Sequence, residues 1–158
     1  MSVKVKNCVV VPIFLSAKIL VAIDLHQGNN IVDVFGAVVK EGEDNYDAAL
    51  RAVPGIIPAN YTLTPFGSFV DFVTKPEGIT ELRVTVYKCL LTPGEYQIES
   101  DRRPEWLTRK QLFEDPRNRR NSRLFDRFFD PTPLQLEIHE DQMNLWIDAK
   151  ITTWTEIN

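Results

Sequence analysis

The amino-acid sequence predicts one α/β domain of 158 residues, a length sufficient for a single packed core. Three observations support this fold class: two apolar, β-type runs near the N-terminus, a short segment of strong helix formers behind a capping aspartate, and a central segment in which apolar and polar residues alternate. The composition, 44% hydrophobic and 25% charged, is ordinary for a soluble globular protein. No apolar stretch is long enough to predict a membrane-spanning or signal segment, so no membrane partner is expected.

The N-terminal third is predicted to be β structure. Residues 9–15 form one apolar run and residues 19–23 a second, and the short turn 16–18 joins them. Pro12 has no N–H to donate to a neighbouring strand, which predicts a bulge or an edge position at that point. Residues 31–35 form a further short strand that leads into a glycine-containing loop.

A helix is predicted from Asp44 to Val53. Asp44 is a favourable N-cap, and residues 48–50 are strong helix formers. Pro54 and Gly55 end the helix, because the residue before a proline avoids helical geometry. Two longer strands are then predicted, at residues 66–73 and 82–91.

The second half of the chain is predicted to add two helices and a hairpin. Glu105-Trp106-Leu107 with Leu112-Phe113 predicts a short helix, and Asp115-Pro116 predicts the start of another. The core-facing stripe of that second helix comprises Leu124, Phe125, Phe128 and Phe129. Residues 134–138 and 145–151 alternate in polarity on either side of a polar turn, which predicts a C-terminal β-hairpin.

The segment 36–51 carries the most specific motif. Residues 36–43 read Gly-Ala-Val-Val-Lys-Glu-Gly-Glu, and Arg51 follows Glu43 after seven residues. This segment resembles the front half of a Nudix box, whose pattern is Gly-Gly-x-Val-Glu-x-Gly-Glu, seven residues, and Arg-Glu-x-x-Glu-Glu-x-Gly. The resemblance implies a Nudix-like α/β/α sandwich with a mixed β-sheet over residues 1–130. Residues 131–158 would then be a C-terminal β-hairpin extension packed on the same domain.

The back half of the box is absent. Ala52, Gly55 and Ile56 stand where the family carries the glutamates that bind metal and assist proton transfer. Magnesium needs oxygen ligands, and none of these three side chains offers one. The resemblance also implies that Arg51 pairs with Glu43 and braces the loop against the helix.

These features favour a protein without catalytic residues or a metal, which uses the Nudix-like fold as a binding or regulatory module for a nucleotide, RNA or protein partner. One alternative is a divergent pyrophosphohydrolase of nucleoside-diphosphate-linked substrates, which would need Mg²⁺ or Mn²⁺. Its carboxylates would be Glu43 with Glu95, Glu99 or Glu105, and Asp101 lies in the same part of the chain. Another alternative is a structural subunit that docks a partner through Trp146 and Trp154 of the hairpin.

Basic residues are concentrated in one window. Residues 102–127 hold nine basic side chains against four acidic ones, a net charge of +5 in a chain whose total is −4. The arginines predicted to bind phosphate or nucleic acid are Arg102, Arg103, Arg119, Arg120, Arg123 and Arg127. A solvated or internally paired face and a protein interface are the two other interpretations of the same window.

The cysteines and histidines predict no further chemistry. Cys8 and Cys89 lie in apolar, strand-like surroundings, which is typical of buried reduced thiols and favours a cytoplasmic location. His26 and His139 are far apart and have no cysteine or acid at metal-ligand spacing, so no zinc site is expected. A hydrolytic triad is also not expected, because no serine or cysteine has a histidine constellation nearby.

Overall fold

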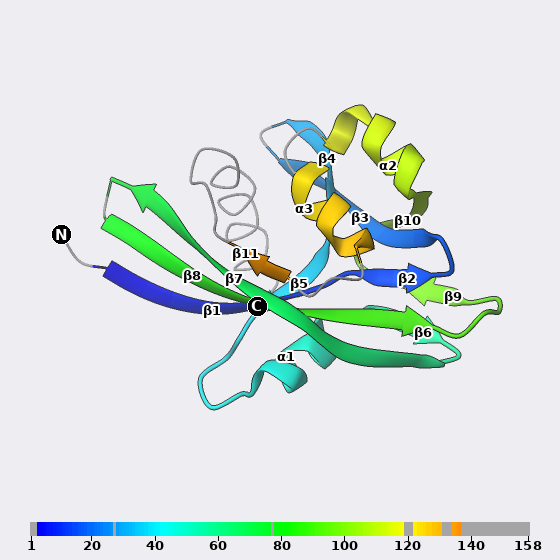
Figure 1. Ribbon diagram of the computed structural model, residues 1–158, viewed down its shortest axis with the longest axis horizontal. Helices are drawn as coiled ribbons and strands as arrows, with labels where there is room; N and C mark the ends of the chain where they lie inside the picture. Colours follow the sequence, from blue (N-terminus) through cyan, green and yellow to red (C-terminus); the bar gives the residue numbers. More distant parts are fainter. Residues whose placement is uncertain (1–2, 27, 77, 119–121, 131–133, 137–158) are drawn as a thin grey trace.

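The computed structural model describes residues 3–26, 28–76, 78–118, 122–130 and 134–136 (Figure 1). The strands are β1 (Val3–Val11), β2 (Ile13–Leu15), β3 (Lys18–His26), β4 (Asn29–Asp33), β5 (Phe35–Val38), β6 (Gly55–Ile57), β7 (Tyr61–Lys75), β8 (Gly78–Leu91), β9 (Gln97–Glu99), β10 (Arg103–Thr108) and β11 (Leu134–Leu136). The helices are α1 (Asn45–Ala52), α2 (Arg109–Glu114), the 3-10 helix η1 (Pro116–Asn118) and α3 (Ser122–Phe129). None of these helices is long and apolar enough to cross a membrane.

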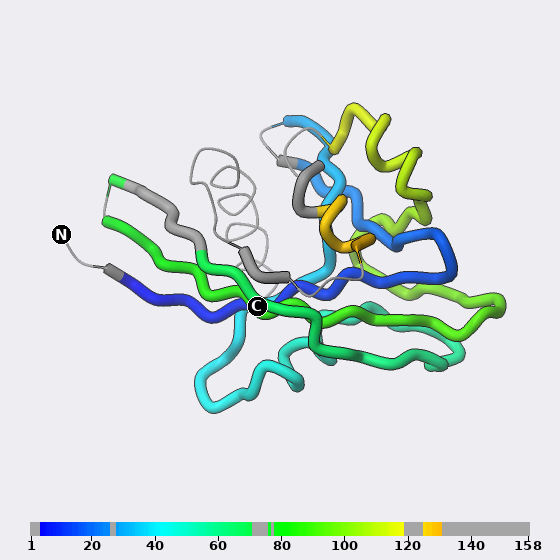
Figure 2. The backbone as a smooth tube through the Cα atoms, viewed as in Figure 1, coloured from blue at the N-terminus to red at the C-terminus, as the bar shows by residue number. Residues whose placement is uncertain are grey.

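The main sheet is mixed, as predicted. Its central strands follow the order β10-β3-β2-β8-β1-β5, with β4 beside β3, β7 beside β8 and β11 beside β7. β8 runs parallel to β1 and β2 and antiparallel to β7, with which it forms a long hairpin (Figure 2). β6 and β9 form a separate two-stranded sheet.

Pro12 marks an exchange of strand partners. β1 ends its pairing with β5 at Val11, and β2 begins its pairing with β3 at Ile13. β8 accompanies both strands across the exchange, and the N–H of Cys89 donates to the carbonyl of Pro12 at 2.9 Å. Pro12 therefore lies inside the sheet and not at its edge, where its missing N–H coincides with the change of neighbour.

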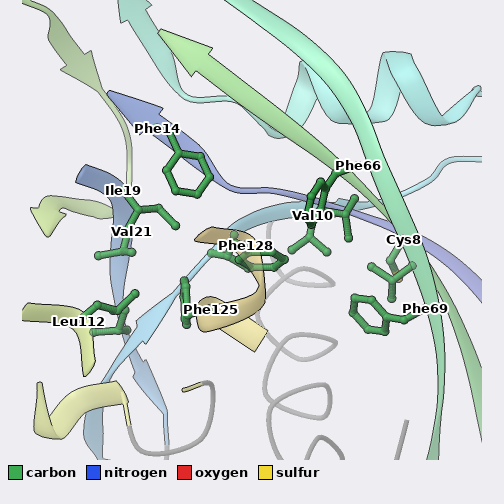
Figure 3. Packing of buried hydrophobic residues seen from close by; sticks show 14 of the residues in the cluster. Cys8, Val10, Phe14, Ile19, Val21, Phe66, Phe69, Leu112, Phe125 and Phe128 are labelled. Atoms are coloured by element: carbon green, nitrogen blue, oxygen red, sulfur yellow. The ribbon is translucent and has the colours of Figure 1, made fainter. Parts of the chain in front are cut away.

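Both faces of the sheet are covered by helices, which makes the fold an α/β/α sandwich (Figure 1). Successive strand residues point to opposite faces, so Val10 belongs to one core cluster and Val9 and Val11 to the other. Phe125 and Phe128 of α3 fill the first cluster from the side of α2 and α3 (Figure 3). The second cluster is closed by the buried alanines of α1, Ala48 and Ala49.

The cysteines are divided between the two clusters. Cys8 belongs to the cluster filled by α3 and Cys89 to the cluster closed by α1, and both are free thiols. Burial raises the pKa of each thiol to about 12. Both side chains therefore stay protonated at neutral pH and act as small apolar core residues.

Several predicted elements differ in the structure. Residues 105–107 are not helical but belong to β10, which pairs with β3, and the helix begins only at Arg109. Asp115 precedes a 3-10 turn, and α3 is described from Ser122 onward. The C-terminal hairpin lies outside the described residues except for β11.

Candidate functional site

A cleft of about 800 Å³ opens beside the C-terminal end of α1. Three segments line it: β5 with the loop after it, the end of α1 with the residues that follow, and β9 with the residues that lead to β10. The lining residues are 35–37, Lys40, 51–54 and 98–102. A cleft of this size falls within the range of small-molecule binding sites, about 300–1,000 Å³.

Glu43, in the loop before α1, and Arg51, in the last turn of α1, form an ion pair. Arg51 donates from Nε to Oε2 of Glu43 at 3.1 Å and from Nη2 to Oε1 at 2.9 Å, and Nη2 also donates to the carbonyl of Val38 at 2.7 Å. The backbone N–H of Lys40 donates to Glu43 at 3.0 Å. The hydrogen bonds from Arg51 and Lys40 lower the pKa of Glu43 to about 2. We name this pair the brace, because it ties the loop to the helix.

Arg102 is held by two aspartates from distant strands. Its Nε donates to Oδ1 of Asp24 in β3 at 3.0 Å, its Nη2 donates to Oδ2 of the same residue, and Nη2 also reaches Oδ2 of Asp33 in β4 at 2.6 Å. The guanidinium carbon lies 5.3 Å from the centre of the Phe35 ring. Asp33 also accepts from the backbone N–H of Val34 at 3.0 Å. We name this group the clamp. The sequence does not predict it, because 78 and 69 residues separate Arg102 from its partners.

Solved structures show what this fold is. A MutT NUDIX hydrolase from Burkholderia pseudomallei matches with 18% identity and a TM-score of 0.57, over 77% of this chain and 95% of that one. A possible asymmetric diadenosine tetraphosphate hydrolase from Jonesia denitrificans matches with 14% identity and a TM-score of 0.58, over 84% and 98%. The chain has a Nudix fold.

Other comparisons place the Nudix similarity at the level of fold. The NUDIX domain of Shewanella oneidensis NrtR complexed with ADP ribose matches with 12% identity and a TM-score of 0.52, over 81% of this chain and 87% of that one. No protein-family model matches the sequence, and no curated protein matches it significantly.

The three positions to which the resemblance assigns the Nudix-box glutamates lie at the end of α1 and beyond it. Ala52 is the last residue of α1, and Gly55 and Ile56 belong to β6. Gly55 pairs with Glu99 in β9, and the side chain of Ile56 is buried in the core. A β-carbon at residue 55 would lie 3.0 Å from Cβ of Glu99, a tight contact, so a side chain at this position would require β9 to shift. Strand β6 thus takes the place of the helical turn that would carry the acids.

The other candidate carboxylates are only partly brought together. Glu99 and Asp101 line the cleft, whereas Glu95 is exposed in the loop before β9 and is not part of the lining. Glu105 lies in β10 and accepts two hydrogen bonds from Arg117, at 3.2 and 2.7 Å, which lower its pKa. Glu43 is engaged by the brace.

The described residues do not reproduce the set of box glutamates that the resemblance implies for a divalent metal. The described cleft lining contains two carboxylates, Glu99 and Asp101, and no group of three or more His, Cys, Asp or Glu side chains suited to a metal occurs among the described residues. Magnesium is usually bound through one or two carboxylates together with water and substrate phosphates, so a metal here would depend on oxygen ligands from the substrate.

Several described arginines of the basic window are paired with acids. Arg102 belongs to the clamp, Arg103 contacts Glu105 at 3.0 Å, and Arg109 contacts Asp126 at 2.5 Å. Arg127 is half-buried in α3, and its Nε is buried without a hydrogen-bond partner among the described residues. Arg119 and Arg120 lie outside the described residues, and only the backbone of Arg123 is described. The prediction that these arginines bind phosphate or nucleic acid therefore stays a prediction.

Proposed function

We propose that this chain is a binding module that holds a small nucleoside-containing ligand in the Nudix cleft and does not hydrolyse it. The observation that carries the proposal is the combination of an open cleft with a box helix that ends at Ala52, followed by β6 where the acids would stand. The open cleft supports a ligand site, and the end of the helix at Ala52 supports the loss of the box glutamates that would hold a metal.

The nature of the ligand is supported by the lining and by one neighbour. The cleft combines apolar groups from Val53, Pro54 and Ile98 with polar and charged ones, so it can contact both the apolar and the hydrogen-bonding parts of a small molecule. The Shewanella oneidensis NrtR domain, which shares the fold, is complexed with ADP ribose in its solved structure. We therefore infer a ligand with a nucleoside part.

Calorimetric titration with adenosine and with ADP ribose, each in EDTA and in Mn²⁺, tests the proposal. We expect saturable binding of at least one ligand in EDTA, and chromatography after long incubation with Mn²⁺ should recover the ligand intact. Ala52→Tyr should abolish binding because the side chain fills the cleft. Ala59→Tyr, at an exposed position outside the lining, is the matched control and should bind as the wild type does.

The hydrolase alternative has one observation in its favour, since Glu99 and Asp101 lie in the cleft. The same titrations separate it from the binding module. Metal-dependent appearance of a cleavage product, lost in Glu99→Gln but kept in Glu95→Gln, would replace the proposal with this alternative. Absence of binding for both ligands at millimolar concentration would reject a small-molecule module of this kind.

A further inference from the structure

The cleft carries more negative than positive charge. Three cations line the cleft. Two acids line it as well, and three more acids are bonded to its arginines, so these eight charged residues have a net charge of −2. The cations are Lys40, Arg51 and Arg102; the acids are Glu99, Asp101, Glu43, Asp24 and Asp33. An anionic ligand would therefore enter a site whose charge has the same sign as its own.

The two arginines of the cleft already hold carboxylates. Arg51 directs two hydrogen bonds at Glu43 and one at the carbonyl of Val38. Arg102 directs Nε and Nη2 at its two aspartates. A phosphate would compete with these carboxylates for the Nε and Nη2 donors, and the positive charge of each arginine is already offset by an acid, so the arginines give little net attraction for an anion.

The dipole of α1 also disfavours an anion in the cleft. Ala52 and Val53, which line the cleft, are the last residue and the C-cap of α1. The C-terminal end of a helix carries the negative end of its dipole, and phosphate sites are typical of the opposite end. The helix and the carboxylates thus both disfavour a phosphate.

We infer that the cleft recognises a neutral, hydroxyl-bearing nucleoside and discriminates against each added phosphate; this rests on the proposed function. Carboxylates only accept hydrogen bonds when ionised, and Glu99 and Asp101 can accept them from ribose hydroxyls.

A ligand series in EDTA tests the inference. Adenosine, AMP and ADP are titrated by calorimetry at low and high salt, and we expect affinity to fall roughly 3- to 10-fold with each phosphate at low salt, since like charges repel near a protein surface. High salt should reduce this difference and leave adenosine binding nearly unchanged, because screening acts on the phosphate charges. 2′-Deoxyadenosine should bind more weakly than adenosine if the cleft forms a hydrogen bond with the 2′-hydroxyl of the ribose.

A matched pair of variants tests whether the carboxylates of the cleft cause the discrimination against phosphate. The double variant Glu99→Gln and Asp101→Asn removes two negative charges from the lining, and it should narrow the difference between adenosine and ADP. Glu95→Gln removes the same kind of charge from the neighbouring loop outside the lining, and it should leave the difference unchanged. Binding of ADP tighter than that of adenosine by the wild type would overturn the inference and leave the proposed function standing. Failure of the whole series and of ADP ribose to bind would overturn both.

Discussion

Two arginines line the same cleft, and both are held by carboxylates, but their surroundings differ. In the brace, the side chains of Arg51 and Glu43 are 28% and 16% exposed. In the clamp, Arg102 is 12% exposed and its partners Asp24 and Asp33 are 11% and 2% exposed. Water can solvate the brace if it breaks, whereas the groups of the clamp have little access to water.

The two groups also connect different parts of the fold. The brace joins a loop to the helix that follows it, so it organises a short stretch of chain. The clamp joins the neighbouring strands β3 and β4 to the segment after β9, which lies far from them in the sequence. Similar chemistry thus stabilises one loop in the brace and links three segments beside the cleft in the clamp.

The largest effect is expected from Arg102→Ala. It leaves two buried carboxylates without their cation, and removing one partner of a buried ion pair costs about 3–5 kcal/mol of the free energy of unfolding. Urea denaturation at neutral pH measures the change. Arg103→Ala is the control, because Arg103 is 68% exposed and its contact with Glu105 should be worth less than about 1 kcal/mol. Equal small losses in both variants would remove the distinction between clamp and surface pair.

A smaller effect is expected from Arg102→Lys. The charge is kept, but an ammonium group cannot reproduce the forked bonds to both aspartates, so one buried acceptor loses its partner at a cost of about 1–3 kcal/mol. Arg51→Lys should cost less, because water can replace the lost bond to Glu43. Urea denaturation measures both losses of stability. If Arg51→Lys were less stable than Arg102→Lys, the brace and not the clamp would depend more on the guanidinium group.

The comparison also explains what the sequence could predict. The brace was predictable because both residues belong to one recognisable motif and are separated by only eight positions. The clamp was not, because nothing in the sequence relates Asp24 or Asp33 to Arg102 before the strands are placed side by side. Pairwise contacts between distant strands depend on register, which a single sequence does not reveal.

The secondary-structure elements were also only partly predictable from the sequence. Apolar runs and alternation predicted the N-terminal strands and the long strands β7 and β8, but not β6, β9 or β10. Capping predicted α1, and Asp44 indeed accepts from the N–H of Asp47 at 2.8 Å as an N-cap should. Trp106 and Leu107 were misassigned to a helix, because a short apolar step is compatible with either structure. Their pairing with Leu20 and Ile19 of β3 makes them part of a strand. Tertiary pairing thus overrides local propensity here.

A double-mutant cycle sharpens the comparison at the brace. Glu43→Gln and Arg51→Met should each reduce stability less than Arg102→Ala does, and the double variant should lose less than the sum of the two single losses, because the residues interact directly. Glu81 and Arg83, which contact each other at 2.9 Å with Arg83 59% exposed, provide the control cycle. That control should show weaker coupling. Additive losses at Glu43 and Arg51 would mean that the brace contributes no pairwise stabilisation.

The smallest effect is the pH dependence of the brace. The pKa of Glu43 is about 2 in the folded protein, against an ordinary value of 4.5, so the unfolded chain binds the proton more readily. The contribution of Glu43 to stability is therefore fully present above the unfolded pKa and is lost as pH falls from about 4.5 towards 2.

Urea denaturation of the wild type and Glu43→Gln at several pH values between 6 and 2 measures this contribution as a difference. We expect the stability difference to be largest above pH 4.5 and to shrink as the carboxylate is protonated. Glu105 and Asp115, whose pKa values Arg117 also lowers, titrate in both proteins and cancel in the difference. In the Arg51→Met background the pH-dependent difference should largely disappear, because the hydrogen bond that lowers the Glu43 pKa most is gone. A difference that stays constant across this range would show that Glu43 stabilises the loop by packing and not by its charge.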